Sequence, residues 1–306
     1  MPRTLLRRVG QLCDTLPTGL RRRRTARRLG GHDIHHAELG SCQIRYRSRA
    51  GTGPSVVFAA DPPVPVELYG ELFECLDRQI SATVFEVPGF NGSLPGPGHS
   101  FSFPNAVGTV ERFLEALPGG PHVLVFPCVV GYLGVTLSLR RPDLVAGLVA
   151  PQMPDWAAGL AWKRGRDPQG LLGRPVLGQL ALAAMKRRRI RQWYASALGG
   201  AARLDTFVAA TVENFDGGGC FCLASGFQDF LTDHHGLLAP MDRPALSVWG
   251  GLDASHRRTE PACALNLLPR AELVTWDDSG HFPELEQPER FAIALNGYLE
   301  TLAVNA

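Results

Sequence analysis

Three residues of the types used in nucleophilic catalysis each follow an apolar run that reads as a strand. Cys128 follows HVLVFP, Asp253 follows ALSVWGGL, and His281 follows AELVTWDDSG. Parallel strands end at the same edge of a sheet, so the loops behind them meet in space. A thiol there can attack a carbonyl carbon, a histidine can carry the proton, and a carboxylate can orient the histidine.

Cys128 lies between an expected strand at 122–127 and an expected helix at 129–140. A helix N-terminus directly behind a thiol lowers the thiol's pKa and raises the thiolate fraction. The alternative is that Cys128 is a small buried apolar residue, because free cysteines are among the most buried residues of all.

The chain alternates between continuous apolar runs and runs with helical spacing. Strands are expected at 55–60, 82–87, 122–127, 144–150, 245–251 and 271–276, and helices at 66–79, 105–117, 129–140 and 288–302. The runs HDIHHAEL and CQIRYRSRA predict two further short strands, joined by a turn at Gly40–Ser41. This pattern predicts an α/β fold with a mostly parallel central sheet and helices on both faces.

Between about Met153 and His235 the alternation stops, no buried strand is visible, and helical patterns carry aromatic and basic residues. We therefore expect a basic arm at 1–30, helical or flexible, a core domain at 31–153 and 237–306, and a helical cap at 154–236. The arm has nine arginines and one acid, Asp14, which gives it a charge near +8 within a chain of net charge +2. The arginines could touch nucleic acid or an anionic membrane, but a solvated arm is the favoured interpretation.

Composition and motifs bear on the cellular compartment, membrane insertion, metal binding and cofactors. There are seven cysteines at irregular spacing and no secretory signal, which predicts a reduced, cytoplasmic protein. No apolar run reaches the roughly eighteen residues of a membrane span. Cys220 and Cys222 lack the two further ligands of a zinc site, so no metal is expected. No G-x-G-x-x-G motif follows the first strands, so no nucleotide cofactor is expected, and we expect no nucleic-acid partner.

Several of these segments together resemble the α/β-hydrolase superfamily over most of residues 33–303. They are RPALSVWGGLDASH, LPRAELVTWDDSGHFPELEQPERFAIALNGYL, VFEVPGFNGS and LRRPDLVAGLVA. The order nucleophile, acid, histidine is that of hydrolases built on a strand, a tight turn and a helix. The resemblance implies the α/β-hydrolase fold with a helical cap, and a triad of Cys128, Asp253 and His281.

The sequence departs from that family at two places. The family's turn is G-x-S-x-G, whereas this chain has Phe126 and Val130 at the glycine positions and Cys128 at the serine position. Bulky flanking residues predict a relaxed or reshaped corner. The oxyanion loop is Ala-Ala-Asp61-Pro-Pro, so the expected backbone donors are Asp61 N–H and Val129 N–H. An Asp61 carboxylate would repel an oxyanion unless it is turned away or protonated, and it could instead contact a substrate amine or hydroxyl.

We expect the substrate to be a small molecule, free or carrier-bound, which contacts Trp156, Trp162, Tyr194 and Phe90. His256, close behind Asp253, remains an open candidate for the border of the site. Three functions stay open. They are acyl transfer or hydrolysis of an ester, thioester or activated amide through Cys128; lyase or cyclase chemistry by the His281–Asp253 pair without a covalent intermediate; and binding without catalysis. The oligomeric state is open as well.

Overall fold

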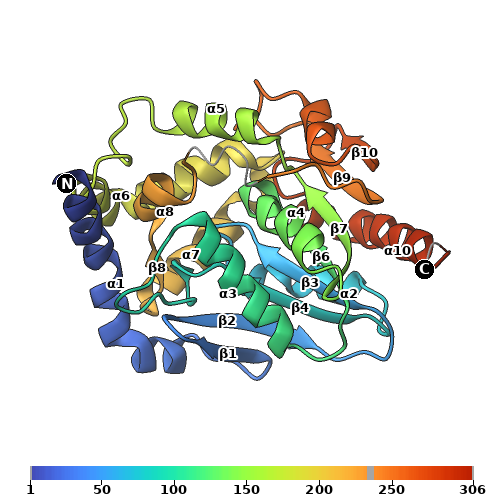
Figure 1. Cartoon of the computed structure of the whole chain (residues 1–306), viewed down its shortest axis with the longest axis horizontal. Helices are drawn as coiled ribbons and strands as arrows, with labels where there is room; N and C mark the ends of the chain where they lie inside the picture. The colour runs from blue at the N-terminus through green and yellow to red at the C-terminus, as the bar shows by residue number, and fades with distance from the viewer. Residues whose placement is uncertain (1, 233–237, 305–306) are drawn as a thin grey trace.

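An eight-stranded sheet forms the centre of the molecule. The computed structural model describes residues 2–232 and 238–304, and side chains from Leu5 onward. The strand order is β1-β2-β4-β3-β6-β7-β9-β10 (Figure 1). The strands are β1 (Ile34–Leu39), β2 (Cys42–Arg49), β3 (Ser55–Ala60), β4 (Ser81–Glu86), β6 (His122–Val125), β7 (Val145–Pro151), β9 (Ala245–Gly250) and β10 (Ala271–Trp276). The β1–β2 and β2–β4 pairs are antiparallel and all the others are parallel, which confirms the predicted mostly parallel sheet.

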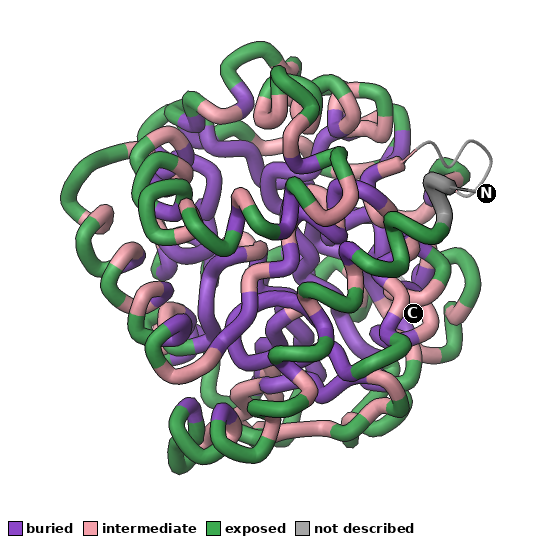
Figure 2. The backbone as a smooth tube through the Cα atoms, turned by 90° about the vertical axis from the view of Figure 1, so that its left-hand side faces the viewer, coloured by how far each residue is buried: buried purple, intermediate pink, exposed green. Residues whose placement is uncertain are grey.

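Two apolar layers lie on the two faces of this sheet. In β3, Val56 and Phe58 face one layer while Val57 faces the other, which follows from the two-residue period of a strand. The first layer is completed by α2 (Gly70–Cys75), α9 (Pro283–Glu286) and α10 (Pro288–Val304), and the second by α3 (Phe103–Ala116) and α4 (Gly131–Arg140). Figure 2 shows the buried interior enclosed by exposed outer turns.

Among the described residues between β7 and β9, the segment predicted to be a helical cap forms four α-helices. They are α5 (Trp156–Arg166), α6 (Leu177–Ala197), α7 (Leu204–Asp216) and α8 (Leu223–Asp229). The predicted boundary at 236–237 lies outside the described residues. The basic arm is one helix, α1 (Pro2–Arg28), which packs on α6 and α8. No helix within the described ranges is long and apolar enough to cross a bilayer.

Two predicted elements differ in the structure. The helix expected at 66–79 is a short 3₁₀ turn, η1 (Val66–Tyr69), followed by α2, which ends because Leu76 is extended (ψ 142°). A two-residue strand, β8 (Cys220–Phe221), pairs with β5 (Phe90–Asn91) inside the segment where no strand was expected. Two residues are too few to give a readable alternation. The other 3₁₀ turns are η2 (Cys128–Val130), η3 (Ala201–Arg203) and η4 (Pro261–Asn266).

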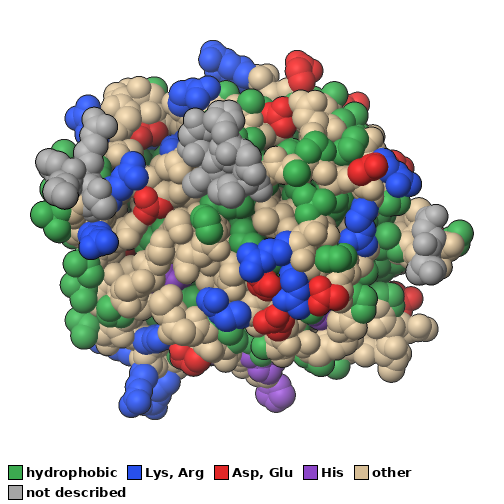
Figure 3. Space-filling model, in the orientation of Figure 1, with side chains coloured by type: hydrophobic (Ala, Val, Ile, Leu, Met, Phe, Trp, Pro, Cys, Tyr) green, Lys and Arg blue, Asp and Glu red, His purple; other side chains and the backbone are tan. Residues whose placement is uncertain are grey.

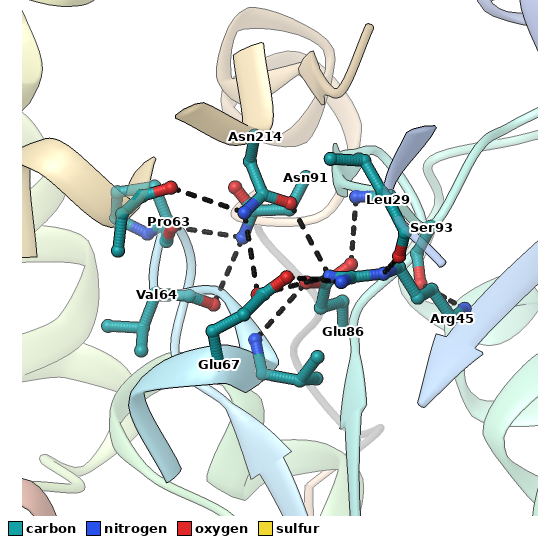
Figure 4. A network of polar contacts seen from close by, with 12 residues as sticks. Leu29, Arg45, Pro63, Val64, Glu67, Glu86, Asn91, Ser93 and Asn214 are labelled. Carbon is teal, nitrogen blue, oxygen red and sulfur yellow. Dashed lines mark hydrogen bonds and ion pairs between the residues drawn. The ribbon is translucent and has the colours of Figure 1, made fainter. Parts of the chain in front are cut away.

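A buried ion pair fastens the loops behind β3 and β4. Arg45 on β2 is 1% exposed, and its Nη1 lies 2.7 Å from Oε1 of the fully enclosed Glu86 at the end of β4. The guanidinium also donates to Glu67 of η1, to Asn214 of α7 and to the carbonyl oxygen of Leu29, just after α1 (Figure 4). Glu86 in turn accepts the N–H groups of Val66 and Gly92. One charged cluster therefore holds five segments that are distant in sequence.

We expect Arg45→Ala to lower the free energy of unfolding by about 3–5 kcal/mol, because it leaves the Glu86 carboxylate buried without its cation. Urea unfolding followed by circular dichroism measures this. Arg191→Ala is the matched control, since the Arg191–Asp205 pair at 3.0 Å is exposed on both sides and should contribute little. Similar effects of the two substitutions would contradict the role given to Arg45.

Candidate active site

The carboxyl ends of four parallel strands bring the candidate catalytic residues together. Asp61 directly follows β3, Cys128 stands behind β6, Asp253 behind β9 and His281 behind β10. All four are at most 3% exposed. The predicted convergence of Cys128, Asp253 and His281 is therefore present in the structure, and the Asp61 side chain joins it.

Cys128 occupies a strained corner. Its φ is +47°, a conformation that is uncommon for a residue with a side chain and that points to a functional constraint. The corner is thus tight and not relaxed, although Phe126 and Val130 flank it. Both bulky side chains are accommodated in the apolar layer of α3 and α4. The close approach falls on Gly131 instead, where an added Cβ would lie 2.4 Å from the Met153 sulfur.

The Cys128 thiol is not a preformed thiolate. Burial, and secondly the Asp61 carboxylate, raise its pKa to about 11, although His281 and the Val129 N–H act in the opposite direction. The helix-terminus effect expected from the sequence is present as the Val129 N–H contact. Burial of the thiol, which is only 2% exposed, raises the pKa by more than the Val129 N–H lowers it.

His281 is held between two carboxylates. Its Nδ1 lies 2.6 Å from Asp253 Oδ2 and its Nε2 lies 2.8 Å from Asp61 Oδ2. Burial alone would lower the pKa of His281, but the two carboxylates and Cys128 raise it well above its usual value. The pKa of Asp253 is lowered: burial acts to raise it, and the charge and hydrogen bond of His281 outweigh burial. This arrangement favours an imidazolium with a proton on each nitrogen.

A second histidine, His256, lies against the same groups. Its Nε2 is 4.0 Å from Cys128 Sγ and its Nδ1 is 3.2 Å from Thr259 Oγ1. The ring stacks on Trp162 (5.5 Å, 10°) and on His281 (5.2 Å, 26°). Burial and then the neighbouring His281 lower the pKa of His256 to about 3, so it is neutral. The sequence left this residue open, because a histidine three positions after an acid has no distinctive pattern.

The two residues expected to supply oxyanion donors both line one cavity. Val129 lies on the wall of the cavity in front of Cys128. Asp61 also lies on this wall, and its carboxylate turns to His281, with Oδ2 2.8 Å from His281 Nε2. The roles of the Asp61 N–H and the Val129 N–H as oxyanion donors stay predictions.

An apolar cavity of about 100 Å³ opens in front of Cys128 and Asp61. Phe90 and Trp162, both predicted to contact substrate, lie on its wall, together with Trp193, Phe227 and Phe230. Trp193 also contacts the His281 ring edge-on at 5.1 Å. Such a wall suits the apolar part of a small molecule.

Trp156 and Tyr194 are not on that wall. Trp156 packs on Tyr132 at 4.8 Å, and the Tyr194 hydroxyl pairs with Thr211 Oγ1 at 2.8 Å inside the core. Both were expected to contact the substrate, but the face of α6 that carries Trp193, one residue before Tyr194, is the one turned to the cavity. A one-residue step rotates a side chain by about 100° around a helix, so the composition of the helix could not decide between them.

Cys128, His256 and His281 are the described residues that could hold a metal ion together. Each offers one ligand atom, and the three atoms lie within 4.8 Å of one another. Thiolate and imidazole are ligands that zinc accepts. Two of the three residues are also the predicted nucleophile and base, so a bound metal would compete with covalent chemistry.

Comparison with known proteins identifies the fold. No protein-family model and no curated protein matches the sequence. Among solved structures, a protein from Salmonella enterica assigned as an acyltransferase matches with a TM-score of 0.71 and 14% identity, over 89% of this chain and 96% of that one. A loop variant of a haloalkane dehalogenase from Bradyrhizobium elkanii matches at 0.67 and 17%, over 89% and 97%. An epoxide hydrolase from Bacillus megaterium matches at 0.62 and 16%, over 87% and 100%.

We expect Asp61→Asn to speed the alkylation of Cys128 by iodoacetamide at pH 8 several-fold. Loss of the negative charge lowers the pKa of the thiol and so raises the thiolate fraction. In the unaltered protein Cys128 should react slowly and accelerate as the pH rises toward 11. Peptide mass mapping measures each cysteine, and buried Cys222 serves as the internal control. An unchanged or slower rate at Cys128 would show that Asp61 does not set its reactivity.

Proposed function

We propose that this chain, which has the α/β-hydrolase fold, is an enzyme that transfers an acyl group from an ester, thioester or activated amide through Cys128. One observation carries the proposal: Cys128 stands at a strained strand-to-helix corner and faces an apolar cavity. A ring nitrogen of His281 lies within 4.8 Å of its thiol, and Nδ1 of His281 is hydrogen-bonded to Asp253. Backbone strain at a side chain that faces a cavity is a sign of function.

The charges suggest how the thiol loses its proton. With His281 already protonated on both nitrogens, two nearby groups keep a lone pair: the Asp61 carboxylate and the neutral His256, whose Nε2 lies 4.0 Å from Cys128 Sγ. We assign the proton to Asp61, because the pKa of His256 is lowered to about 3 and its ring is a poor base. In the proposed step the Cys128 Sγ–H proton passes to the Asp61–His281 pair as Sγ bonds to the carbonyl carbon. Protonation neutralises Asp61, which removes its repulsion of the oxyanion and leaves a carboxyl O–H as a donor beside Val129 N–H.

Collapse of the tetrahedral intermediate completes the transfer. The carbon–heteroatom bond of the leaving group breaks, and the leaving group takes the proton from Asp61. Water or an amine then attacks the thioester and releases Cys128. Phe90, Trp162 and Trp193 would hold an apolar acyl chain against the wall of the cavity. We propose hydrolysis or transfer to an amine as the second half-reaction, since a thioester reacts with both.

A specific observation favours a second candidate. His281 Nε2 is hydrogen-bonded to Asp61 at 2.8 Å, so Asp253, His281 and Asp61 form an acid–base chain that ends at the cavity. That chain could move a proton on a bound substrate without a covalent intermediate, as in a lyase or cyclase. Cys128 would then only line the pocket.

Substitution of Cys128 separates the two candidates. Acyl p-nitrophenyl esters and acyl thioesters of increasing chain length serve as probes, with whole-protein mass measured after rapid quenching. We expect an added acyl mass on Cys128, and loss of both adduct and turnover in Cys128→Ala. His281→Ala should lower turnover by about 10²–10⁴-fold.

Cys222→Ser is the matched control for this experiment, since Cys222 is equally buried and lies outside the catalytic group. It should leave adduct and turnover unchanged. Turnover that survives in Cys128→Ala but disappears in Asp61→Asn would overturn the covalent mechanism and establish the acid–base chain instead.

A further inference from the structure

Helix α1 is mounted on the protein with its apolar side outward. Its inward side carries Gly10, Thr15, Thr18 and Thr25, all buried, whereas Leu5, Val9, Leu12, Leu16 and Leu20 are 65%, 40%, 42%, 47% and 88% exposed. The spacing of these five residues, four, three, four and four, places them in one stripe. A helix whose other face meets only water has the opposite arrangement. We call these five residues the leucine stripe.

Specific polar contacts fix this orientation. The Thr18 hydroxyl donates to the carbonyl oxygen of Pro95 at 2.6 Å, and Ser225 of α8 donates to the Asp14 carboxylate at 2.7 Å. Arg22 pairs with Glu38 at 2.6 Å. Because the polar side is bonded to the body, α1 cannot turn its leucines inward without losing these contacts.

Positive charge continues along the outward side. Arg23 and Arg27 follow Leu20 at helical spacing on the stripe, Arg24 lies beside them, and all three are exposed. Within the described part of the chain none of the three has a carboxylate within ion-pair distance, while Arg7 and Arg22, on the inward side, are paired. Figure 3 shows hydrophobic side chains along the edge where Figure 1 draws α1, with Lys and Arg below them.

We propose that the outward side of α1 docks the protein on the surface of an anionic lipid bilayer. The leucine stripe would enter the boundary between head groups and acyl chains, and the arginines would meet lipid phosphates. Charge argues against parallel pairing with a second copy of the chain, since that would bring two arginine clusters together, and sedimentation tests antiparallel pairing. Nucleic acid would use the arginines but leave the leucines in water.

The docked face lies close to the cavity. Helix α8 contacts α1 through Ser225, and the cavity is lined by Leu223, Gly226 and Phe227 of the same helix. A bilayer under α1 would therefore lie one helix away from the proposed acyl pocket. Binding to the bilayer is independent of the proposed reaction, so the two can fail separately.

Flotation of the full chain with vesicles tests the proposal. We expect binding to vesicles of equal parts phosphatidylcholine and phosphatidylserine, weak binding to phosphatidylcholine alone, and release by salt. The pair Arg23→Gln/Arg27→Gln should weaken binding by about tenfold to thirtyfold. The pair Leu12→Ser/Leu16→Ser should weaken it by about tenfold or more, since two partly inserted leucines are lost.

Matched controls come from other exposed residues of the same types. Leu177→Ser/Leu180→Ser on α6 (55% and 58% exposed) and Arg257→Gln/Arg258→Gln should leave vesicle binding unchanged. Absence of binding to anionic vesicles, or equal loss in stripe and control variants, would overturn the proposal. So would a dimer in sedimentation analysis that the Leu12/Leu16 variant converts to a monomer, because a second copy would then cover the stripe.

A fluorophore placed on α1 reports directly whether this helix contacts the bilayer, without a variant that weakens binding. Cys13, next to Leu12, is the exposed member of the seven free cysteines. An environment-sensitive fluorophore on Cys13 should shift to the blue with anionic vesicles and be quenched by quenchers placed in the acyl chains. A fluorophore that stays in water while the protein binds would show that another surface is responsible.

Discussion

The buried pair of Arg45 and Glu86 is the interaction on which the surroundings of the cavity depend. A carboxylate and a guanidinium removed from water need each other and a full set of further partners. Here those partners are backbone and side-chain groups of the loops behind β3 and β4, which carry Asp61 and Phe90. The requirement to satisfy one buried charge therefore fixes the two loops that form part of the candidate site.

The need of a buried charge for partners also governs the group of Asp61, His281 and Asp253. Asp61, His281 and Asp253 place one expected positive charge between two negative ones inside an apolar shell. The neighbouring thiol stays protonated, because a third negative charge would have no partner. Reactivity at Cys128 must then come from proton movement during the reaction. A preformed ion pair between thiolate and imidazolium, the usual resource of reactive cysteines, is absent from this arrangement of described residues.

The sequence predicted what local patterns encode. Apolar runs of four to eight residues indicated the sheet strands, and the position of Cys128, Asp253 and His281 behind such runs indicated their convergence. Pairings between distant loops have no local signature, so the bond from Asp61 to His281 and the stacking of His256 were not predicted. Phe126 and Val130 suggested a relaxed corner, but both pack in the apolar layer while Cys128 keeps its positive φ. The position that needs a glycine is Gly131, one residue beyond the motif.

The hydrogen bond from the Arg45 guanidinium to the Leu29 carbonyl oxygen, 2.9 Å long, joins the end of α1 to a charged group that is only 1% exposed. Helix α1 is therefore no detachable extension. A chain that began after Gly31 would leave the guanidinium short of an acceptor, in a place where water does not replace it readily. A partner that displaces α1 would therefore remove one acceptor from the Arg45 guanidinium and, through Arg45 and Glu86, perturb β2 and the loops behind β3 and β4.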